Sequence, residues 1–268
     1  MISLLNLFKK KEEVNPKREK QTNPTNSKVA TRKGEIGEYK IDIQLSQLPK
    51  EYLYVNDIMI KNTKSITGYS QIDHVVLTPY GIFIIETKNY QGTIYGGKNR
   101  KHWLINGNFK MKNPLIQNYG HIGALKLILD KKFHGQFISI VSFTKRCTLK
   151  IDPEIREISS DEIVIYDLYL SETIKRKVLR AKLKHKEVLL TINDIENMYR
   201  SLTEANITDT NLREEHTNSI KNKDQNNSKS IKAAKCVICH KTVSLKVKNY
   251  CLSNKKFNGK IYCYDHQK

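Results

Sequence analysis

A tight turn between two β-strand patterns constrains the fold of this chain more than any other feature of its sequence. Residues 71–78 and 82–87 are rich in apolar and β-branched side chains, and Thr78-Pro79-Tyr80-Gly81 separates them. Proline at the second position and glycine at the fourth favour a type I turn, so the two segments are predicted to form a hairpin. Residues 82–85 are apolar on both faces, which is typical of a central strand. A fully disordered chain is therefore excluded.

Around this hairpin, helix and strand patterns alternate, which predicts a mixed α/β fold. Further strands are expected at residues 52–60, 137–143 and 163–166, and helices at 34–48, 171–184 and 192–202. Asn113-Pro114 matches an N-cap followed by proline at the first helical position, and predicts one more helix. The side chains expected in the core from these patterns are Trp103, Ile116, Tyr119, Ile122, Leu129, Ile195, Met198, Tyr199 and Leu202.

The net charge of the chain is concentrated at its two ends. The 268 residues include 47 Lys and Arg against 27 Asp and Glu, a net charge of +20. Residues 1–33 hold 9 basic and 3 acidic side chains and residues 221–268 hold 12 and 2, which leaves +4 for the centre. A basic end is either a solvated tail or a surface for a polyanion such as nucleic acid.

Composition also predicts how the chain is divided. Residues 1–33 are expected to be a disordered basic lead-in, 206–232 a polar linker, and 233–268 a small C-terminal module. No apolar stretch approaches the 18 residues of a membrane-spanning helix. The apolar start at residues 1–8 precedes the basic residues 9–11, which is the reverse of a secretory signal, so a cytoplasmic location is expected. Residues 1–11, apolar and then basic, would bind an anionic membrane only marginally.

Two carboxylates face each other across the predicted hairpin. If Pro79-Tyr80 forms the loop, Asp73 lies opposite Glu86, and a bulge at Gly81 would shift this pairing by one residue. Carboxylates this close repel unless they are protonated or bridged by a cation, and Mg²⁺ suits a bridge that keeps water and phosphate ligands. Lys88, on the same face as Glu86, would stabilise charge on a phosphate or orient a water molecule. The alternative is that these residues and Gln71 are merely the polar ends of buried strands.

Three more polar residues are candidates by position. Gln117 and His121 lie one turn apart on the predicted helix, so they project from one face and would orient substrate, or His121 is an ordinary surface or core histidine. Asn89, directly after Lys88, would cap the strand end or contact phosphate.

Four of the five cysteines follow residue 235, in a pattern typical of a metal site. Cys236 and Cys239 form one knuckle and Cys263 and His266 a second, each with two residues between the ligands. Thiolates and a neutral imidazole suit tetrahedral Zn²⁺, and about 30 residues need such a staple to fold. These four residues are the predicted zinc ligands, and Cys251 is the candidate to replace one of them. A disulfide framework is the competing interpretation.

Four motifs follow one another along the chain: Lys33-Gly34-Glu35-Ile36-Gly37-Glu38, Gln71-Ile72-Asp73-His74, Gly81-Ile82-Phe83-Ile84-Ile85-Glu86-Thr87-Lys88-Asn89 and Asn113-Pro114-Leu115-Ile116-Gln117-Asn118. In this order they resemble the nuclease-related domain (NERD) family, which is assigned to the PD-(D/E)xK nuclease superfamily. The end of the chain, with Tyr250-Cys251, Phe257, Gly259 and Tyr262-Cys263, resembles the topoisomerase-type zinc finger at the C-terminus of some NERD proteins.

This resemblance implies a restriction-endonuclease-like mixed sheet flanked by helices, with the family domain at 34–150 and an α/β extension at 151–205. It places Asp73, Glu86 and Lys88 at the superfamily's Asp…Glu-x-Lys positions, with Gln71 beside them. It also assigns Glu38 to an acidic position of the first helix, although an acid in a first helical turn is equally explained by the helix dipole. The implied activity is a nuclease hydrolysing DNA with Mg²⁺ or Mn²⁺, assisted by the zinc module. The alternative is a non-catalytic nucleic-acid-binding protein that retains the fold.

Overall fold

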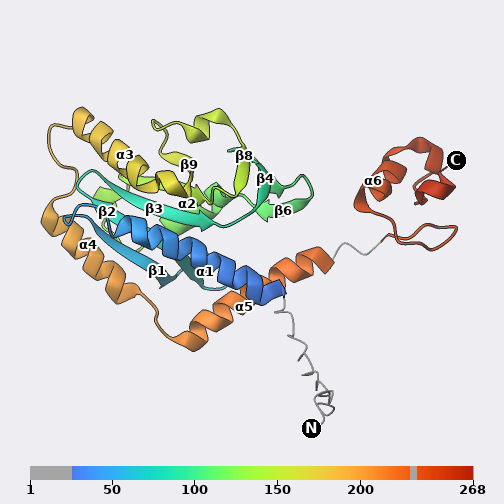
Figure 1. Cartoon of the computed structure of the whole chain (residues 1–268). Helices are drawn as coiled ribbons and strands as arrows, with labels where there is room; N and C mark the ends of the chain where they lie inside the picture. Colours follow the sequence, from blue (N-terminus) through green and yellow to red (C-terminus); the bar gives the residue numbers. More distant parts are fainter. Residues whose placement is uncertain (1–25, 230–233, 268) are drawn as a thin grey trace, which may run out of the picture.

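The computed structural model describes residues 26–229 and 234–267, with side chains at 36–220, 234–244 and 246–267, and shows a mixed α/β fold (Figure 1). The predicted lead-in is outside the described residues up to residue 25. The elements in chain order are α1 (Asn26–Leu45), β1 (Leu53–Lys61), β2 (Tyr69–Thr78), β3 (Gly81–Lys88), β4 (Gly92–Tyr95), β5 (His102–Ile105), β6 (Phe109–Lys112), α2 (Pro114–Leu125), β7 (Phe137–Phe143), β8 (Cys147–Lys150), β9 (Glu162–Tyr166), α3 (Leu170–Lys184), α4 (Ile192–Ala205), α5 (Thr210–Lys229) and α6 (Leu245–Ser253).

The main sheet has five strands in the order β1-β2-β3-β7-β9. Strands β1, β2 and β3 are antiparallel neighbours, whereas β7 and β9 run parallel to β3. Thr78 pairs with Gly81 and His74 with Ile85, so the predicted hairpin is confirmed in the expected register. The parallel half of the sheet brings the carboxyl ends of β3, β7 and β9 to one edge, and the candidate site lies at that edge.

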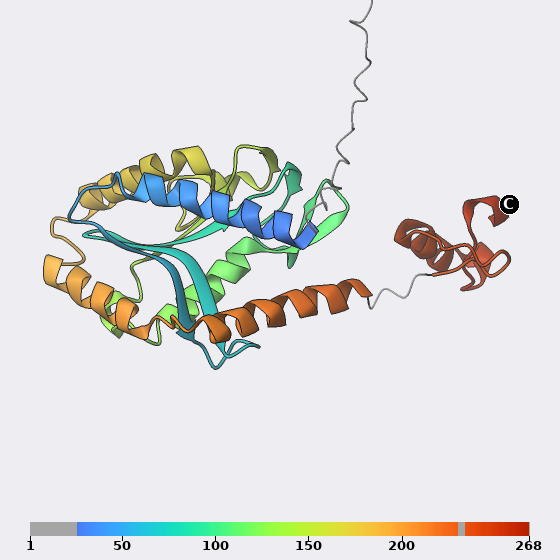
Figure 2. The same cartoon turned by 60° about the horizontal axis from the view of Figure 1, so that its bottom comes forward.

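Helices cover both faces of this sheet (Figure 2). Helices α1 and α3 pack on one face against Phe83 and Ile140. Helices α2 and α4 pack on the other face against Leu77 and Ile84, with Ile195, Met198 and Leu202 of α4 buried as predicted. A central strand that is apolar on both sides, such as β3, is the expected consequence of this three-layer arrangement.

A second, four-stranded sheet follows the order β6-β5-β4-β8 and was not predicted. Trp103 of β5 is fully buried in its core, as expected. The Trp103 indole donates to the carbonyl of Gly97 at 3.0 Å and stacks at 6.1 Å on Phe143, the last residue of β7. This contact joins the small sheet to the edge of the main sheet where the candidate site lies.

Four predictions are corrected by the structure. Residues 26–33, assigned to a disordered lead-in, belong to α1, and residues 210–229, assigned to a linker, form α5. Tyr199 of α4 is half-exposed rather than buried. Helix α2 buries a different face from the predicted one: Ile116 is 44% and Tyr119 72% exposed, because Leu115, Asn118 and His121 face the sheet instead.

Within the parts of the chain that the structure describes, no helix combines the length and the apolar character needed to cross a membrane. The division into domains at residues 34–150, 151–205 and 233–268 stays a prediction.

Candidate functional site

The candidate site forms where β2 and β3 separate. Their ladder ends at His74 and Ile85, one residue before Asp73 and Glu86 would pair. Asp73 instead turns its carboxylate to β3, and its Oδ2 accepts a hydrogen bond from the backbone N–H of Thr87 at 2.7 Å. A side-chain acceptor thus replaces the carbonyl that the ladder no longer supplies. The separation keeps Asp73 beside Glu86 and leaves room at the strand end.

Glu86 lies at the centre of a polar network and is only 2% exposed. Its Oε1 accepts hydrogen bonds from Lys88 Nζ at 2.5 Å and from Gln117 Nε2 at 2.6 Å. Lys88 Nζ also donates to Gln117 Oε1 at 3.1 Å, so the three side chains form a closed triangle. His121 Nδ1 lies 3.4 Å from Glu86 Oε2, and neither atom has a hydrogen-bond partner among the described residues.

The N-cap of α2 and a buried asparagine fix the helix that carries Gln117 and His121 into this network. Asn113 Oδ1 caps the helix by accepting from the N–H of Leu115 at 2.9 Å, while its Nδ2 donates to the carbonyl of Arg100 at 2.8 Å. Asn118, fully buried, donates to the carbonyl of Ile84 at 2.9 Å and fixes the helix to β3. The predicted cap is therefore confirmed, and it sets the rotation that aims Gln117 at Glu86.

Burial and nearby charges shift the pKa values of the titratable side chains in this network. Burial, and then the negative charge of Glu86, hold the pKa of Asp73 well above its usual value. Burial lowers the pKa of His121, so this imidazole is neutral at pH 7. Burial acts to lower the pKa of Lys88 as well, but the charges of Glu86 and Asp73 outweigh it and raise that pKa. The single ammonium group of Lys88 thus faces the two carboxyl groups of Glu86 and Asp73, so acidic groups outnumber basic ones at the site.

The other predicted residues divide into two groups. Glu38 lies close enough for its charge to raise the pKa of Asp73 further. Gly37 explains this approach of α1, because a Cβ at that position would lie 3.3 Å from the Cβ of Asn89 and 3.4 Å from Cγ2 of Thr87. Gln71, by contrast, uses its amide outside the network, donating to Asp57 Oδ1 at 2.6 Å.

Helix α5 adds residues that the sequence did not identify. Arg213 forms an ion pair with Asp57 Oδ2 at 2.7 Å and donates to the Asp57 carbonyl, and Asp57 holds Gln71. His216 is buried against Tyr69 and is near enough for its charge to lower the pKa of His121. The polar composition of α5 gave no indication of these contacts. Arg213 and His216, one turn apart on the helix, are too weak a sequence pattern to predict a site.

A second group of candidate ligands lies in the C-terminal module. Cys236, Cys239, Cys263 and His266 place their ligand atoms within 4.8 Å of one another. His266 Nδ1 lies 3.5 Å from Cys236 Sγ and 3.2 Å from Cys263 Sγ, and the sulfurs of Cys239 and Cys263 are 3.6 Å apart. Tetrahedral zinc, with bonds of about 2.0–2.3 Å, sets neighbouring ligand atoms about 3.5–3.8 Å apart, so this donor set fits a small zinc module.

Two cysteines of the module, Cys236 and Cys251, lie in different environments. Burial acts to raise the pKa of Cys236, but backbone N–H groups of Cys239, Cys263 and Ile238 and the His266 side chain outweigh it and lower the value to about 5. Cys251 is buried outside the group of four and exchanges hydrogen bonds of 3.4 Å with the backbone of Tyr262. Its sulfur therefore contributes to the packing of the module in this geometry.

Comparison with known proteins shows the family to which the chain belongs. The sequence profile described as "Nuclease-related domain" matches residues 33–144, the span that carries Glu38, Asp73, Glu86 and Lys88. An uncharacterized protein of Bacillus anthracis is 31% identical over 196 residues, which cover 71% of this chain and 85% of that protein. At this identity and coverage, the chain belongs to the nuclease-related domain family. No solved structure gives a significant match.

Proposed function

We propose that the protein is a metal-dependent nuclease that hydrolyses phosphodiester bonds of DNA. The observation that carries this proposal is the gathering of Asp73, Glu86 and Lys88 at one strand end, with Glu86 Oε2 buried and free of hydrogen bonds among the described residues. A buried anionic oxygen without a donor is costly in a folded protein, and a cation at that oxygen would remove the cost. The family match adds independent support.

Asp73 and Glu86 are the residues that would hold Mg²⁺ or Mn²⁺. Both offer carboxylate oxygens, which these hard cations prefer, and the excess negative charge described above favours a cation between them. When bound, such an ion would stabilise the charge on the phosphate and lower the pKa of a water molecule. Glu38 would add a third acid to the same space.

The remaining residues of the network would bind and orient the reacting groups. Lys88, fixed between Glu86 and Gln117, presents a positive charge where a phosphate would lie beside the carboxylates. Gln117 keeps both Glu86 and Lys88 in place and would act as a positioning residue. His121, neutral and close to Glu86, would limit the rotation of that carboxylate. Gln71 and Asn89 would support the two strand ends.

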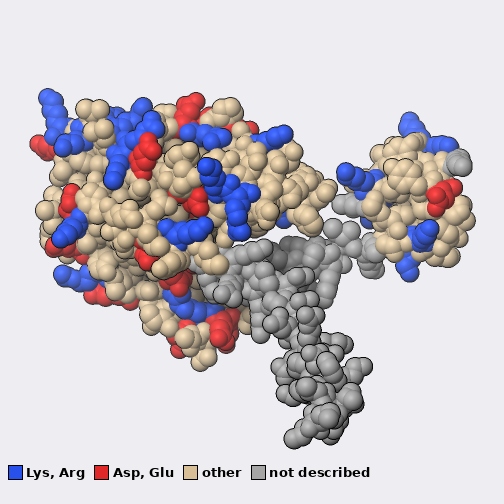
Figure 3. All heavy atoms as spheres, in the orientation of Figure 1, with Lys and Arg blue, Asp and Glu red and all other residues tan. Residues whose placement is uncertain are grey.

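The C-terminal module would hold zinc through Cys236, Cys239, Cys263 and His266 and assist binding to DNA. Between residues 234 and 267 it carries seven lysines and a single acid, Asp265. Figure 3 shows mostly basic charge on its visible face, whereas the α/β part shows both signs. Phe257 is buried between Tyr250 and Tyr262, but Tyr250 and Tyr264 are 52% and 79% exposed and available for base stacking.

The test of catalysis compares wild type with Asp73→Asn on single- and double-stranded DNA, each with added Mg²⁺ or Mn²⁺. Asparagine keeps the acceptor for the Thr87 N–H but removes the charge, so cleavage should fall at least about 100-fold while the fold is kept. Asp130→Asn is the matched control, because it changes an exposed N-cap residue that asparagine replaces well. Equal cleavage by wild type and Asp73→Asn would point to a contaminant. Binding without cleavage by both proteins would establish a non-catalytic nucleic-acid-binding protein.

Zinc is tested separately by metal analysis of the purified full chain. About one zinc ion per chain is expected, and simultaneous Cys→Ser replacement at Cys236 and Cys239 should remove it. A metal-free wild-type chain whose C-terminal module resists proteolysis would contradict the assignment.

A further inference from the structure

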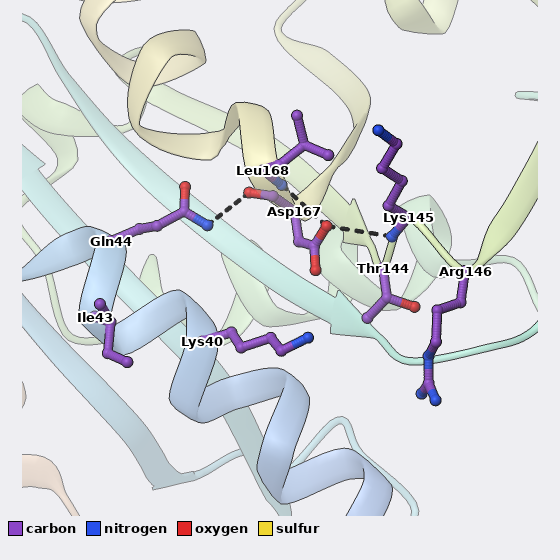
Figure 4. A pocket seen from close by; sticks show the side chains of 8 residues that line it. All are labelled: Lys40, Ile43, Gln44, Thr144, Lys145, Arg146, Asp167 and Leu168. Atoms are coloured by element: carbon purple, nitrogen blue, oxygen red, sulfur yellow. Dashed lines mark hydrogen bonds between the residues drawn. The ribbon is translucent and has the colours of Figure 1, made fainter.

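A second basic feature lies next to the candidate site, in a pocket of about 410 Å³. Helix α1 forms one wall with Lys40 and Gln44, and the turn after β7 forms another with Lys145 and Arg146 (Figure 4). Asp167, at the start of the 3-10 turn Asp167–Tyr169, closes the third side. In Figure 4, Lys40 and Asp167 extend into the same space, while Lys145 and Arg146 extend from the rim.

The pocket belongs to the same edge of the main sheet as Glu86 and Lys88. Strands β3, β7 and β9 are parallel, and Lys88 pairs with Phe143, which pairs in turn with Tyr166. The N–H of Thr144 donates to the carbonyl of Lys88 at 3.1 Å, so the turn that carries Lys145 and Arg146 is fixed to the site strand. The carboxyl ends of parallel strands are where α/β proteins commonly bind ligands.

The charges of the pocket are not neutralised internally. Arg146 donates to a neutral group, Oδ1 of Asn89, at 2.6 Å. Lys40 and Lys145 form no ion pair within the described residues. Asp167 Oδ1 already accepts from the N–H groups of Lys145 at 3.2 Å and Leu168 at 2.9 Å, so its charge is stabilised by backbone donors. Three cations against one acid leave the pocket with a net charge of +2.

We propose that this pocket binds a backbone phosphate of the nucleic-acid strand, one or two nucleotides from the bond that is cut. Neighbouring strands of a sheet lie about 4.8 Å apart, so the pocket lies about 5–10 Å from the end of β3. Successive phosphates of one strand of B-DNA advance about 3.4 Å along the axis and also turn around it, so their separation in space is roughly twice that rise and falls within this range. The assignment of the bond that is cut rests on the proposed nuclease function, but binding of the phosphate does not require cleavage.

A phosphate contact at this pocket would position the nucleic-acid strand relative to the candidate site. Phosphate contacts set the register of a nucleic acid on a protein and carry no base specificity. Arg146 is joined to Asn89, the residue after Lys88, so a phosphate held at Arg146 would be in fixed register with the carboxylates. The pocket would therefore select a polymer over a mononucleotide, because only a polymer fills both places.

The test measures binding of a short oligonucleotide by the full chain across a salt series, without added Mg²⁺. The variants are Lys40→Ala, Lys145→Ala and Arg146→Gln, the last chosen because glutamine removes the charge and keeps a polar amide. Lys182→Ala is the matched control, since Lys182 is an exposed lysine in the last turn of α3, about 18 Å along that helix from its start. The triple variant should bind several-fold more weakly and lower the slope of log K against log salt by about 0.7–0.9, one phosphate contact. The loss should be equal for different base sequences.

Four outcomes of this experiment distinguish the phosphate-binding proposal from its alternatives. A slope for the triple variant equal to that of Lys182→Ala would overturn the proposal. A loss confined to oligonucleotides with a 5′-phosphate, and absent with a 5′-hydroxyl, would also overturn it, because the pocket would then bind a chain end or free phosphate. With Mg²⁺ added, a raised KM at unchanged kcat for Lys40→Ala would support it. If wild type cuts nothing, the nuclease proposal fails, while a changed binding slope would still establish the phosphate contact.

Discussion

Replacing Asp73 by asparagine should make the protein more stable while it strongly lowers the proposed cleavage of DNA. Asp73 and Glu86 lie at the same strand end, and the ammonium group of Lys88 interacts with the charges of both. Asparagine is isosteric and still accepts from the N–H of Thr87, so the substitution removes the charge and little else. A residue that destabilises the fold is expected at a functional site and is hard to explain as a structural polar residue.

The size of the effect follows from the hairpin register. Asp73 and Glu86 follow directly after the last pair of the ladder, and two like charges about 5 Å apart repel by about 3 kcal/mol at an effective dielectric constant of about 20. Lys88 offsets part of this repulsion, which leaves a gain in the free energy of unfolding of about 1–3 kcal/mol. For a chain of this size each kcal/mol raises the Tm by about 2–4 °C.

The assay is thermal unfolding of wild type, Asp73→Asn and the control Asp130→Asn, each without added Mg²⁺. Asp130→Asn should stay within about 0.5 kcal/mol of wild type. Mg²⁺ at ten times its Kd should then stabilise wild type by about 1.4 kcal/mol and leave Asp73→Asn almost unchanged. A Tm of Asp73→Asn at or below that of wild type would refute the reasoning, because it would mean that the two carboxylates do not repel.

Three further predictions concern other parts of the molecule. Gln117→Ala should lower kcat for DNA cleavage about 10- to 100-fold, since Gln117 holds Glu86 and Lys88, whereas its exposed neighbour Tyr119→Ala should not; equal kcat values would contradict the positioning role. Cys263→Ser should abolish the proposed zinc binding and expose the C-terminal module to limited proteolysis, and a retained stoichiometric zinc ion would argue against this ligand. Hydrogen bonds from Thr191, and then Lys132, lower the pKa of Asp194 to about 2, so the stability of the α4 cap is present above about pH 4 and is lost as the pH falls towards 2. Asp194→Asn should flatten this part of the acid-unfolding curve, and identical curves would contradict it.

The hairpin and its carboxylates were predictable because their cause is local. The loop Pro79-Tyr80 sets the register, and the register alone brings Asp73 towards Glu86. The ladder ends at His74, however, and no local pattern indicates where β2 leaves β3. On its other side β2 is irregular at the same place, because Asp57 of β1, with a φ of 48°, lies opposite Asp73 where the pairing of β1 with β2 is interrupted.

The buried face of α2 was predicted wrongly because its apolar residues do not decide its rotation. Ile116 and Tyr119 are apolar but exposed, while Asn118 is polar and fully buried. Asn118 satisfies its amide on the carbonyl of Ile84 and on Ser139 Oγ, and that pairing exists only when the sheet is already formed. The second sheet escaped prediction for a related reason: its strands have four residues each, too few to show a period.

Helix α5 shows how a segment can be polar along its length and still be bound to the domain. Its composition has the low hydrophobicity of a linker, yet Arg213 makes three hydrogen bonds of 2.7 Å, to both Asp57 oxygens named above and to the carbonyl of Ile207. Charge-assisted bonds of this kind are about twice as strong as neutral ones, and they leave no signal in a hydrophobic pattern. Because Asp57 also holds Gln71, the chain that leads to the C-terminal module is attached two residues from Asp73. Arg213→Ala should therefore disturb β2 around Asp73 as well as the attachment of α5.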